Sequence, residues 1–213
     1  GAAGTLIEAL DSGFNGKLVL EGASPVGGKL GQRAFSERLT LYDDGLTPDG
    51  PGSAPFDDEG TATRRTTLID AGVVNAFLYD LNTAARAGAQ TTGNANRGLA
   101  SLPAPGSHCI WMQPGDATLE EMLGDVREGL LVDQTMGAWT GNTLAGEFSG
   151  NVHLGYRIEN GELVGRVKDT MLAGNVFQAL SDIAAIGKEL HWVSGSLRLP
   201  YLYLPSLGVA SKA

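Results

Sequence analysis

The stretch FSGNVHLGYRIENGELVGRVKDTMLAG, residues 148–174, carries the strongest fold signal in this chain. Apolar and polar residues alternate on both sides of Asn160–Gly161, as they do in strands that bury one face. Asn-Gly supplies the two positive-φ residues of a type I′ turn, and the twist of that turn suits antiparallel strands. The stretch therefore predicts a β-hairpin with strands over 148–159 and 162–174.

Other short apolar runs predict further strands. The 31 glycines among the 213 residues are spread between these runs rather than gathered in a linker, which indicates tight turns. In the last part of the chain, Pro200 and Pro205 favour edge positions, because proline cannot donate to a strand ladder. The predicted strands cover residues 16–22, 38–43, 66–70, 73–80 and 107–113, and the tail from 192; Ala71–Gly72 turns the chain between the third and fourth.

Helices are predicted where the apolar spacing changes from two to between three and four residues. Residues 81–88 end on Gly88, which suits a left-handed cap, and Asn175 caps residues 175–190. Residues 118–129 begin with Thr118 and Glu121 in capping-box spacing. We therefore expect one α+β domain spanning 1–213, with mostly antiparallel strands and hairpins in a barrel- or sandwich-like sheet and three to four helices.

The composition argues against nucleic acid as a partner and against a membrane-spanning segment. Fifteen Lys and Arg against 24 Asp and Glu give a net charge of −9, and the basic residues are scattered, so we expect no nucleic-acid partner. Apolar runs such as residues 73–79 fall far short of the roughly 20 residues that span a membrane, and the N-terminal residues lack a signal-peptide pattern. The single Cys109 excludes an internal disulfide, which favours a cytoplasmic location.

The segment FDDEGTATRR, residues 56–65, concentrates three carboxylates and two arginines. Asp57, Asp58 and Glu59 are adjacent, so in an extended segment they point to alternating sides and do not chelate one ion together. The spacing of a calcium loop is also absent. A turn at Gly60 with Arg64 or Arg65 pairing back onto the acids is the simplest interpretation, with a ligand contact and a metal site as alternatives.

No catalytic constellation is visible from residue types alone. Nucleophile motifs are missing, and GASPVGGKLG, residues 22–31, lacks the order of a phosphate-binding loop. His108 and Cys109 are neighbours in a predicted strand and point to opposite faces, so Cys109 is expected to be a small buried residue. His153 and His191 lie too far from His108 in sequence for zinc-ligand spacing, and structural roles are expected for both.

Five segments in the same order together resemble the TldD/PmbA family, the modulators of DNA gyrase that are also classed as metallopeptidases. They are SPVGGKLG (24–31), FDDEGTATRRTTLIDAGVV (56–74), TTGNANR (91–97), GEFSGNVHLGYRIENGE (146–162) and LAGNVFQALSDIAAIGKEL (172–190). The resemblance covers the C-terminal half of the family's chain and implies an α+β domain. The family's N-terminal α/β domain is absent from this sequence.

The resemblance also implies a metal motif, which this chain does not retain. Active members carry H-E-x-x-x-H on a helix and a later cysteine as the third ligand, with the glutamate as general base. In the register set by residues 24–31, the histidine positions are Ile7 and Ser12, and the glutamate is Glu8. The cysteine position falls at Ser194. We therefore expect no metal cofactor and no catalytic role for Glu8.

Replaced ligands are the pattern of the PmbA/TldE branch, whose members resemble a silent subunit paired with TldD. The resemblance implies a non-catalytic subunit of a metallopeptidase complex that encloses extended, unfolded peptides. A stand-alone peptide-binding or scaffold protein that forms a homodimer is the alternative hypothesis. A third is an enzyme that uses Glu8 and Asp11, three residues apart on a predicted helix, with a residue of the absent N-terminal domain.

Contacts to a peptide or a partner are predicted in two of the resembling segments, residues 56–74 and 91–97. Because FDDEG is shared by both branches of the family, it does not distinguish the metal-binding members. A turn close to the cavity or the subunit interface is therefore expected at this place. The residues predicted to contact a peptide or a partner are Asp57, Asp58, Glu59, Thr92, Gly93 and Asn94.

Overall fold

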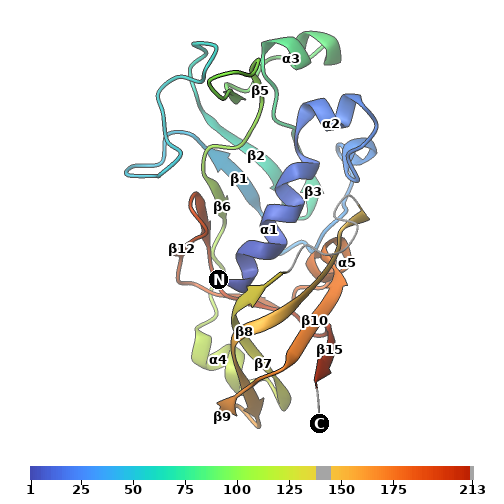
Figure 1. Cartoon of the computed structure of the whole chain (residues 1–213), viewed down its shortest axis with the longest axis vertical. Coiled ribbons are helices and arrows are strands. Elements are labelled where there is room, and N and C mark those ends of the chain that lie inside the picture. Colours follow the sequence, from blue (N-terminus) through green and yellow to red (C-terminus); the bar gives the residue numbers. More distant parts are fainter. Residues whose placement is uncertain (138–144, 212–213) are drawn as a thin grey trace.

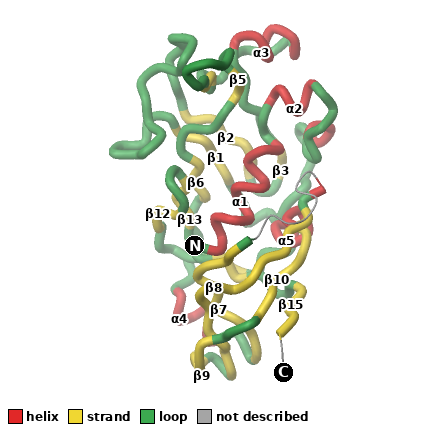
Figure 2. Tube along the Cα trace, viewed as in Figure 1, coloured by secondary structure: helices red, strands yellow, loops and turns green. Residues whose placement is uncertain are grey.

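The computed structural model describes residues 1–137 and 145–211, which fold around two main β-sheets (Figures 1 and 2). The larger sheet has six strands, and every neighbouring pair is antiparallel except β13 and β6. In spatial order its strands are β12 (His191–Val193), β13 (Leu197–Leu199), β6 (Ile110–Met112), β1 (Leu41–Asp44), β2 (Arg65–Asp70) and β3 (Val73–Val74).

The second sheet is built on the predicted hairpin. Asn160 and Gly161 have φ angles of 49° and 85°, which confirms the turn at the expected place. The predicted second strand is divided in two, because one part pairs with the end of β8 and the other with its beginning. The strands are β15 (Gly208–Ser211), β10 (Thr170–Asn175), β8 (Glu147–Glu159), β7 (Glu128–Met136) and, paired with β8 alone, β9 (Glu162–Arg166).

Two short strand pairs complete the β-structure. One joins β4 (Ala95–Asn96) to β5 (Ala104–Pro105) within the predicted loop, and the other joins β11 (Ala185–Ile186) to β14 (Leu202–Tyr203). Neither main sheet closes into a barrel among the described residues. The predicted α+β class with mostly antiparallel strands is confirmed, in its sandwich-like form.

Helix α1 (Ala2–Gly13) connects the two sheets. Its buried residues Ile7 and Leu10 belong to the same hydrophobic core as Leu41, Ile110 and Leu199 of the larger sheet. At its N-terminal end, the Thr5 and Thr135 hydroxyls lie 3.1 Å apart, which ties α1 to β7. In Figure 1, α1 runs along the middle of the molecule between the upper loops and the lower sheet.

Four further helices raise the total in the described part to five, one more than the upper expectation. These are α2 (Gly16–Leu20), α3 (Leu81–Ala87), α4 (Leu119–Gly124) and α5 (Val176–Ser181); a short 3-10 helix, η1 (Gly27–Lys29), follows α2. Helix α3 ends as predicted, because Gly88 adopts the left-handed conformation with φ 64°.

The predicted strand at residues 16–22 is wrong, because this segment forms helix α2. The Asn15 side chain accepts hydrogen bonds from the backbone N–H groups of Lys17 (2.9 Å) and Leu18 (3.4 Å). This N-cap satisfies donors that a helix start leaves free and so selects a helical turn. The apolar run alone did not distinguish a short strand from a short helix.

The helices predicted over 118–129 and 175–190 are shorter than expected, although both caps are confirmed. Thr118 and Glu121 form the capping box of α4, and Asn175 caps α5. Residues after each helix then pair with distant strands, Glu128 in β7 and Ala185 in β11. Such long-range pairing overrides local helix propensity. Likewise, the predicted strand at 73–80 is confined to the two residues of β3.

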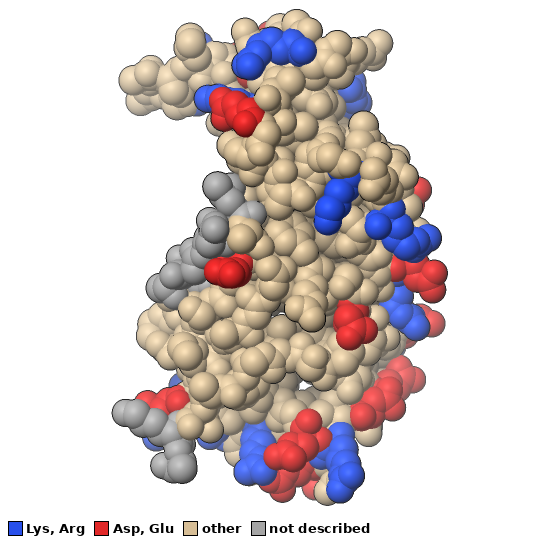
Figure 3. Space-filling view, turned by 90° about the vertical axis from the view of Figure 1, so that its right-hand side faces the viewer, with Lys and Arg blue, Asp and Glu red and all other residues tan. Residues whose placement is uncertain are grey.

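Within the described ranges, we find no helix long and apolar enough to cross a membrane. Figure 3 shows one face of the molecule, with acidic and basic side chains interspersed at its lower end and few charges across its middle. No concentrated basic surface is seen on this face. The expectation, from the net charge of −9, that nucleic acid is not a partner stays a prediction.

Candidate functional site

The first candidate region is the face of α1 that carries the motif positions. Ile7 is fully buried in the hydrophobic core, whereas Glu8 is exposed to solvent. Ser12 is exposed near the end of the helix, and its hydroxyl donates to the carbonyl oxygen of Ala9 at 2.9 Å. Helix geometry therefore sends neighbouring motif positions into different environments, one into the core and the next into water.

The remaining motif position, Ser194, lies beside the first turn of this helix. Ser194 and Gly195 form the β12–β13 turn with φ angles of 41° and 69°. A Cβ atom placed on Gly4 would lie 3.6 Å from the Ser194 hydroxyl oxygen. Because Gly4 and Glu8 are four residues apart, they share a face of α1. The structure thus brings the Ser194 turn to the helix face that carries Glu8.

The side chains at these positions do not fit a zinc ion. Zinc in proteins takes imidazole, thiolate and carboxylate ligands, and a catalytic site needs three of them. Ile7 offers no donor atom, and Ser12 and Ser194 offer neutral hydroxyls, so Glu8 supplies the one strong ligand of the four positions. In the described part of the chain, no group of three His, Cys, Asp or Glu side chains is placed to hold a metal.

Asp11, on the same helix, has an unusual environment. The Ser107 hydroxyl donates to its Oδ2 at 2.8 Å, while Oδ1 is buried without a hydrogen-bond partner. The pKa of Asp11 is raised to about 6, mainly by burial; the Ser107 hydrogen bond lowers it, and the charges of Asp43 and Glu8 add smaller upward contributions. Asp11 and Glu8 therefore differ, one being desolvated and the other solvent-exposed.

The acidic segment at 57–59 acts as a set of backbone clamps. Asp57 Oδ1 accepts from the N–H groups of Glu59 (3.0 Å) and Thr61 (2.8 Å), and its Oδ2 accepts from the N–H of Ala95 (3.0 Å). The first two bonds close the turn at Gly60, whose φ is 77°. The third joins this turn to β4, so Asp57 has a structural role that links two of the resembling segments.

Asp58 and Glu59 extend these clamps to other elements. Asp58 Oδ2 accepts from the N–H of Arg97 at 2.8 Å, and Glu59 Oε2 accepts from the N–H of Leu81 at 2.8 Å. Leu81 is the first residue of α3, where a carboxylate satisfies a free N–H and suits the helix dipole. Both side chains remain at the surface, so further contact to a peptide or partner stays a prediction.

The expected pairing of Arg64 or Arg65 with these acids is wrong. Arg65 binds Asp44 instead, with its Nη2 2.7 Å and its Nε 3.0 Å from Asp44 Oδ2. Arg64 donates to the carbonyl oxygen of Thr91. Backbone N–H groups donate hydrogen bonds to the carboxylates of Asp57, Asp58 and Glu59. The two arginines therefore pair with other acceptors.

The Thr92-Gly93-Asn94 segment packs tightly behind the acidic segment. Thr92 Oγ1 accepts from the N–H of Tyr79 at 2.8 Å. Gly93 has a φ of 72°, and a Cβ there would lie 2.5 Å from the carbonyl oxygen of Ala62. Asn94 is buried. These three residues therefore support the acidic segment at 57–59 from the protein interior. An additional contact of theirs to a peptide or a partner remains a prediction.

Asn94 belongs to a buried polar network that sequence reasoning missed. Its Nδ2 donates to Asp43 Oδ2 at 2.6 Å and lies 3.0 Å from His108 Nδ1. Asp43, which is fully buried, also accepts from the N–H groups of His108 (2.7 Å) and Cys109 (3.0 Å). The signal was the pair Asp43–Asp44 at the end of a predicted apolar strand, where two acids need partners. Cys109 itself is a buried free thiol, as expected.

A cavity of about 450 Å³ lies between the N-terminal end of α1, helix α4 and the sheet that contains β7 and β8. Its walls are largely apolar, with Leu6, Met122, Leu131 and Phe148 among them, and His191 lies at its side. The apolar residues Leu119, Met122 and Leu123 of α4 and Val126 just after it also line this cavity. A concave apolar site of this size suits apolar side chains of a ligand.

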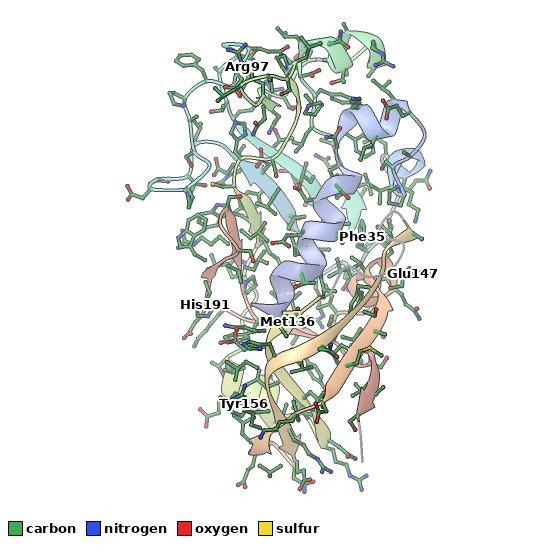
Figure 4. All side chains as sticks on the ribbon, in the orientation of Figure 1. Phe35, Arg97, Met136, Glu147, Tyr156 and His191 are labelled. Atoms are coloured by element: carbon green, nitrogen blue, oxygen red, sulfur yellow. The ribbon has the colours of Figure 1, made fainter. Side chains whose placement is uncertain are left out.

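The cavity and the acidic segment at 57–59 lie in different parts of the molecule. In Figure 4, Arg97, which is bonded to Asp58, lies among the loops at the top, whereas His191 lies in the lower half. Helix α1 links them, because its N-terminal end lines the cavity and Asp11 near its C-terminal end binds Ser107. The predicted contact residues therefore do not surround this cavity.

The comparisons with known proteins identify the family. The family model described as "PmbA/TldA metallopeptidase C-terminal domain" matches residues 1–211. A metalloprotease of Methanothermobacter thermautotrophicus is 34% identical over 182 residues, which are 85% of this chain and 40% of the relative. A "Metalloprotease TldD homolog" of Buchnera aphidicola is 29% identical over 191 residues, 89% of this chain and 39% of the relative.

Solved structures agree with this assignment. The crystal structure of TldE from Thermococcus kodakarensis superimposes with a TM-score of 0.87 at 30% identity, over 95% of this chain and 46% of that one. A Thermotoga maritima structure, described as a candidate modulator of a DNA gyrase, gives a TM-score of 0.86 at 32% identity, over 96% and 46%. The chain thus spans less than half the length of these relatives, and it belongs to the PmbA/TldD metallopeptidase family.

Proposed function

We propose that this chain is part of a PmbA/TldE-like, non-catalytic subunit that works with a TldD-like, metal-binding partner on extended peptides. The single observation that carries the proposal is the donor set on α1 and the β12–β13 turn. Ile7, Ser12 and Ser194 stand where the resemblance implies metal ligands, and none of them is a zinc-ligand type.

The chemistry follows from that donor set. A metallopeptidase needs a metal to activate water, and the motif glutamate then takes a proton from that water. Ile7 is 0% exposed and packs in the core, so neither its chemistry nor its position allows metal binding. Glu8 remains on the helix face beside the Ser194 turn, but it has no metal-bound water to deprotonate. The resemblance to TldE supports the same conclusion.

The proposal includes the place of peptide and partner. The apolar cavity beside β7 offers space for side chains of an extended peptide, and β7 is an edge strand that pairs with β8 alone. We place partner or peptide contacts at Asp58 and Glu59, whose side chains reach the surface, and assign to the buried Asp57, Thr92, Gly93 and Asn94 the role of holding that segment in place. A cytoplasmic location, in keeping with the free thiol of Cys109, is also part of the proposal.

The test combines the full-length protein with a TldD-like homologue, carrying H-E-x-x-x-H, from the same genome. We expect hydrolysis of an unfolded peptide by the mixture and none by the full-length protein alone. Glu8→Gln should leave the rate of the mixture unchanged within about twofold, because Glu8 touches no metal-bound water. The control is replacement of the motif glutamate in the homologue, which should abolish the rate in the same mixture.

Two outcomes would contradict the proposal. Hydrolysis by the protein alone that disappears with Glu8→Gln would favour the enzyme hypothesis based on Glu8 and Asp11. A protein that binds peptide but forms no complex with the homologue would favour the stand-alone binder. For the contact residues, Asp58→Asn should weaken assembly or peptide turnover, whereas unchanged values of both would remove Asp58 from the interface.

A further inference from the structure

An aromatic–arginine row crosses the larger sheet on the side away from α1. It consists of Trp192, Arg198, Trp111 and Tyr42, with Arg65 at its end. Trp192 is directly opposite Arg198, Arg198 opposite Trp111, and Trp111 opposite Tyr42, so four strands contribute to one line. The Tyr42 and Trp111 rings stack 6.1 Å apart with an interplanar angle of 16°.

The row lies on the open face of the sheet. Its neighbours along each strand, Leu41, Ile110 and Leu199, are buried in the core, and side chains alternate between the two faces of a strand. Row members are instead half-buried or exposed, with Trp192 at 43%. A row of aromatic rings on a solvent-facing sheet is a surface that suits protein recognition, because such rings give large contact area with little loss of rotamer freedom.

Arg198 is the unusual member of the row. Its guanidinium carbon lies 4.2 Å from the Trp111 ring centroid and 5.5 Å from that of Trp192, so both rings contact the cation. Among the described residues it has no hydrogen bond or ion pair, and its Nε is buried without a partner. Arg65, at the other end, differs because Asp44 neutralises it at 2.7 Å.

The two terminal nitrogens of the half-buried Arg198 side chain are not among its buried atoms and have no hydrogen-bond partner among the described residues, so they are open to a planar anion. Carboxylates match two such nitrogens with two parallel hydrogen bonds. The Trp111 and Trp192 rings that contact Arg198 also favour apolar groups next to that carboxylate. Burial raises the pKa of the neighbouring Tyr42 phenol, which therefore stays neutral and can donate a hydrogen bond to the same anion.

We propose that the aromatic–arginine row binds an acidic, extended peptide segment of a partner protein, with Arg198 pairing to a carboxylate of that segment. Charge complementarity favours a peptide over a nucleic acid. The chain carries −9, and one unpaired guanidinium does not offset the repulsion of a polyanionic backbone. A segment with one or two carboxylates between apolar side chains carries far less negative charge and therefore meets much less of that repulsion.

The test measures binding of a synthetic peptide, acetyl-Leu-Glu-Val-Glu-Leu-amide, to the full-length protein by calorimetry. Its twin with glutamine in place of both glutamates leaves the protein unchanged and removes only the carboxylates. We expect the twin to bind at least tenfold more weakly. Arg198→Lys should weaken the acidic peptide by a similar factor, because lysine keeps the charge but loses the stacked, two-pronged geometry.

A matched control is Arg86→Gln, which removes an exposed arginine of α3 far from the row; its affinity should stay within twofold of the wild type. Trp192→Leu, a surface change, should weaken binding with Arg198 retained. Equal affinity for the two peptides, or no binding of either, would overturn the proposal. So would tighter binding of an oligouridylate than of the acidic peptide, since that would assign the row to nucleic acid.

Discussion

At the scale of single residues, the buried carboxyl of Asp11 makes the stability of the protein depend on pH. Its Oδ1 is buried without a partner, and its Oδ2 has one hydroxyl donor, so the ionised form is poorly solvated. A buried carboxyl is then easier to keep protonated than to ionise. The protein accepts this arrangement at the point where α1 meets the loop before β6, and its stability depends on pH as a result.

We predict that Asp11→Asn removes part of the pH dependence of stability. The pKa of Asp11 is raised from 3.8 to about 6 in the folded state, so its contribution is fully present below pH 3.8 and is lost as pH rises through 6. Between pH 4 and pH 7, the unfolding free energy of the variant should rise relative to wild type by about 2 kcal/mol, since one pKa unit is worth about 1.4 kcal/mol.

Urea unfolding at several pH values would measure this difference. Glu37→Gln is the control, because it removes an exposed carboxylate that is not among the groups acting on Asp11. A constant difference between the Asp11 variant and wild type across this range would show that the carboxyl titrates as an ordinary surface group.

At the scale of elements, the acidic segment at 57–59 and the Thr92-Gly93-Asn94 segment behind it depend on two glycines. These glycines have similar backbone angles and different surroundings. Gly60 and Gly93 have φ angles of 77° and 72°. A Cβ on Gly60 would meet nothing within 4 Å, whereas one on Gly93 would lie 2.5 Å from the Ala62 carbonyl oxygen. Left-handed backbone costs any L side chain about 1–2 kcal/mol, but only Gly93 adds a clash with backbone.

We therefore predict that Gly60→Ala lowers the unfolding free energy by about 1 kcal/mol and Gly93→Ala by about 3 kcal/mol or more. The unfolding midpoint in urea at constant m-value measures both. Equal losses for the two variants would mean that the backbone around Ala62 moves to accept the extra methyl group.

The elements also show which parts of the fold can be predicted from local sequence. Asn160–Gly161, Gly88 and the caps at Thr118 and Asn175 were readable, because each acts within four residues of its own position. The helix at 16–20 was missed because Asn15 caps a run whose apolar residues also suit a strand. Long-range pairing was not readable at all.

The candidate site divides in the same way. The replaced ligand types at Ile7, Ser12 and Ser194 are visible in the sequence through the resemblance, but the proximity of Ser194 to the first turn of α1 is not. Likewise, the carboxylates of Asp57 and Asp58 could be named, while their backbone partners lie 38 and 39 residues away. A tertiary fold is needed before such partners meet.

At the scale of the whole molecule, stability should differ between the two sheets. Strands β1, β2 and β6 contribute fully buried residues to the core, including Leu41, Leu68 and Ile110. All residues of β9 and β15 are instead exposed. Regions with few buried apolar contacts open at lower free energy than the core.

We predict that native-state hydrogen exchange separates these strands. Amides of β9 and β15 should exchange through openings that cost at least about 2 kcal/mol less than those of β1, β2 and β6. Amides of α1 should exchange with the slow group, because Ile7 and Leu10 belong to the same core. Uniform protection of both sheets would instead indicate one cooperative unit.

The burial of Ile7 also has an evolutionary consequence. Histidine at this position would put an imidazole among apolar side chains while Ser12 and Ser194 offer only hydroxyls, and an unpaired buried polar group costs several kcal/mol. Sequences with this single change would lose stability without a set of metal ligands in return. The burial of residue 7 is therefore a barrier to the stepwise introduction of a metal site on α1.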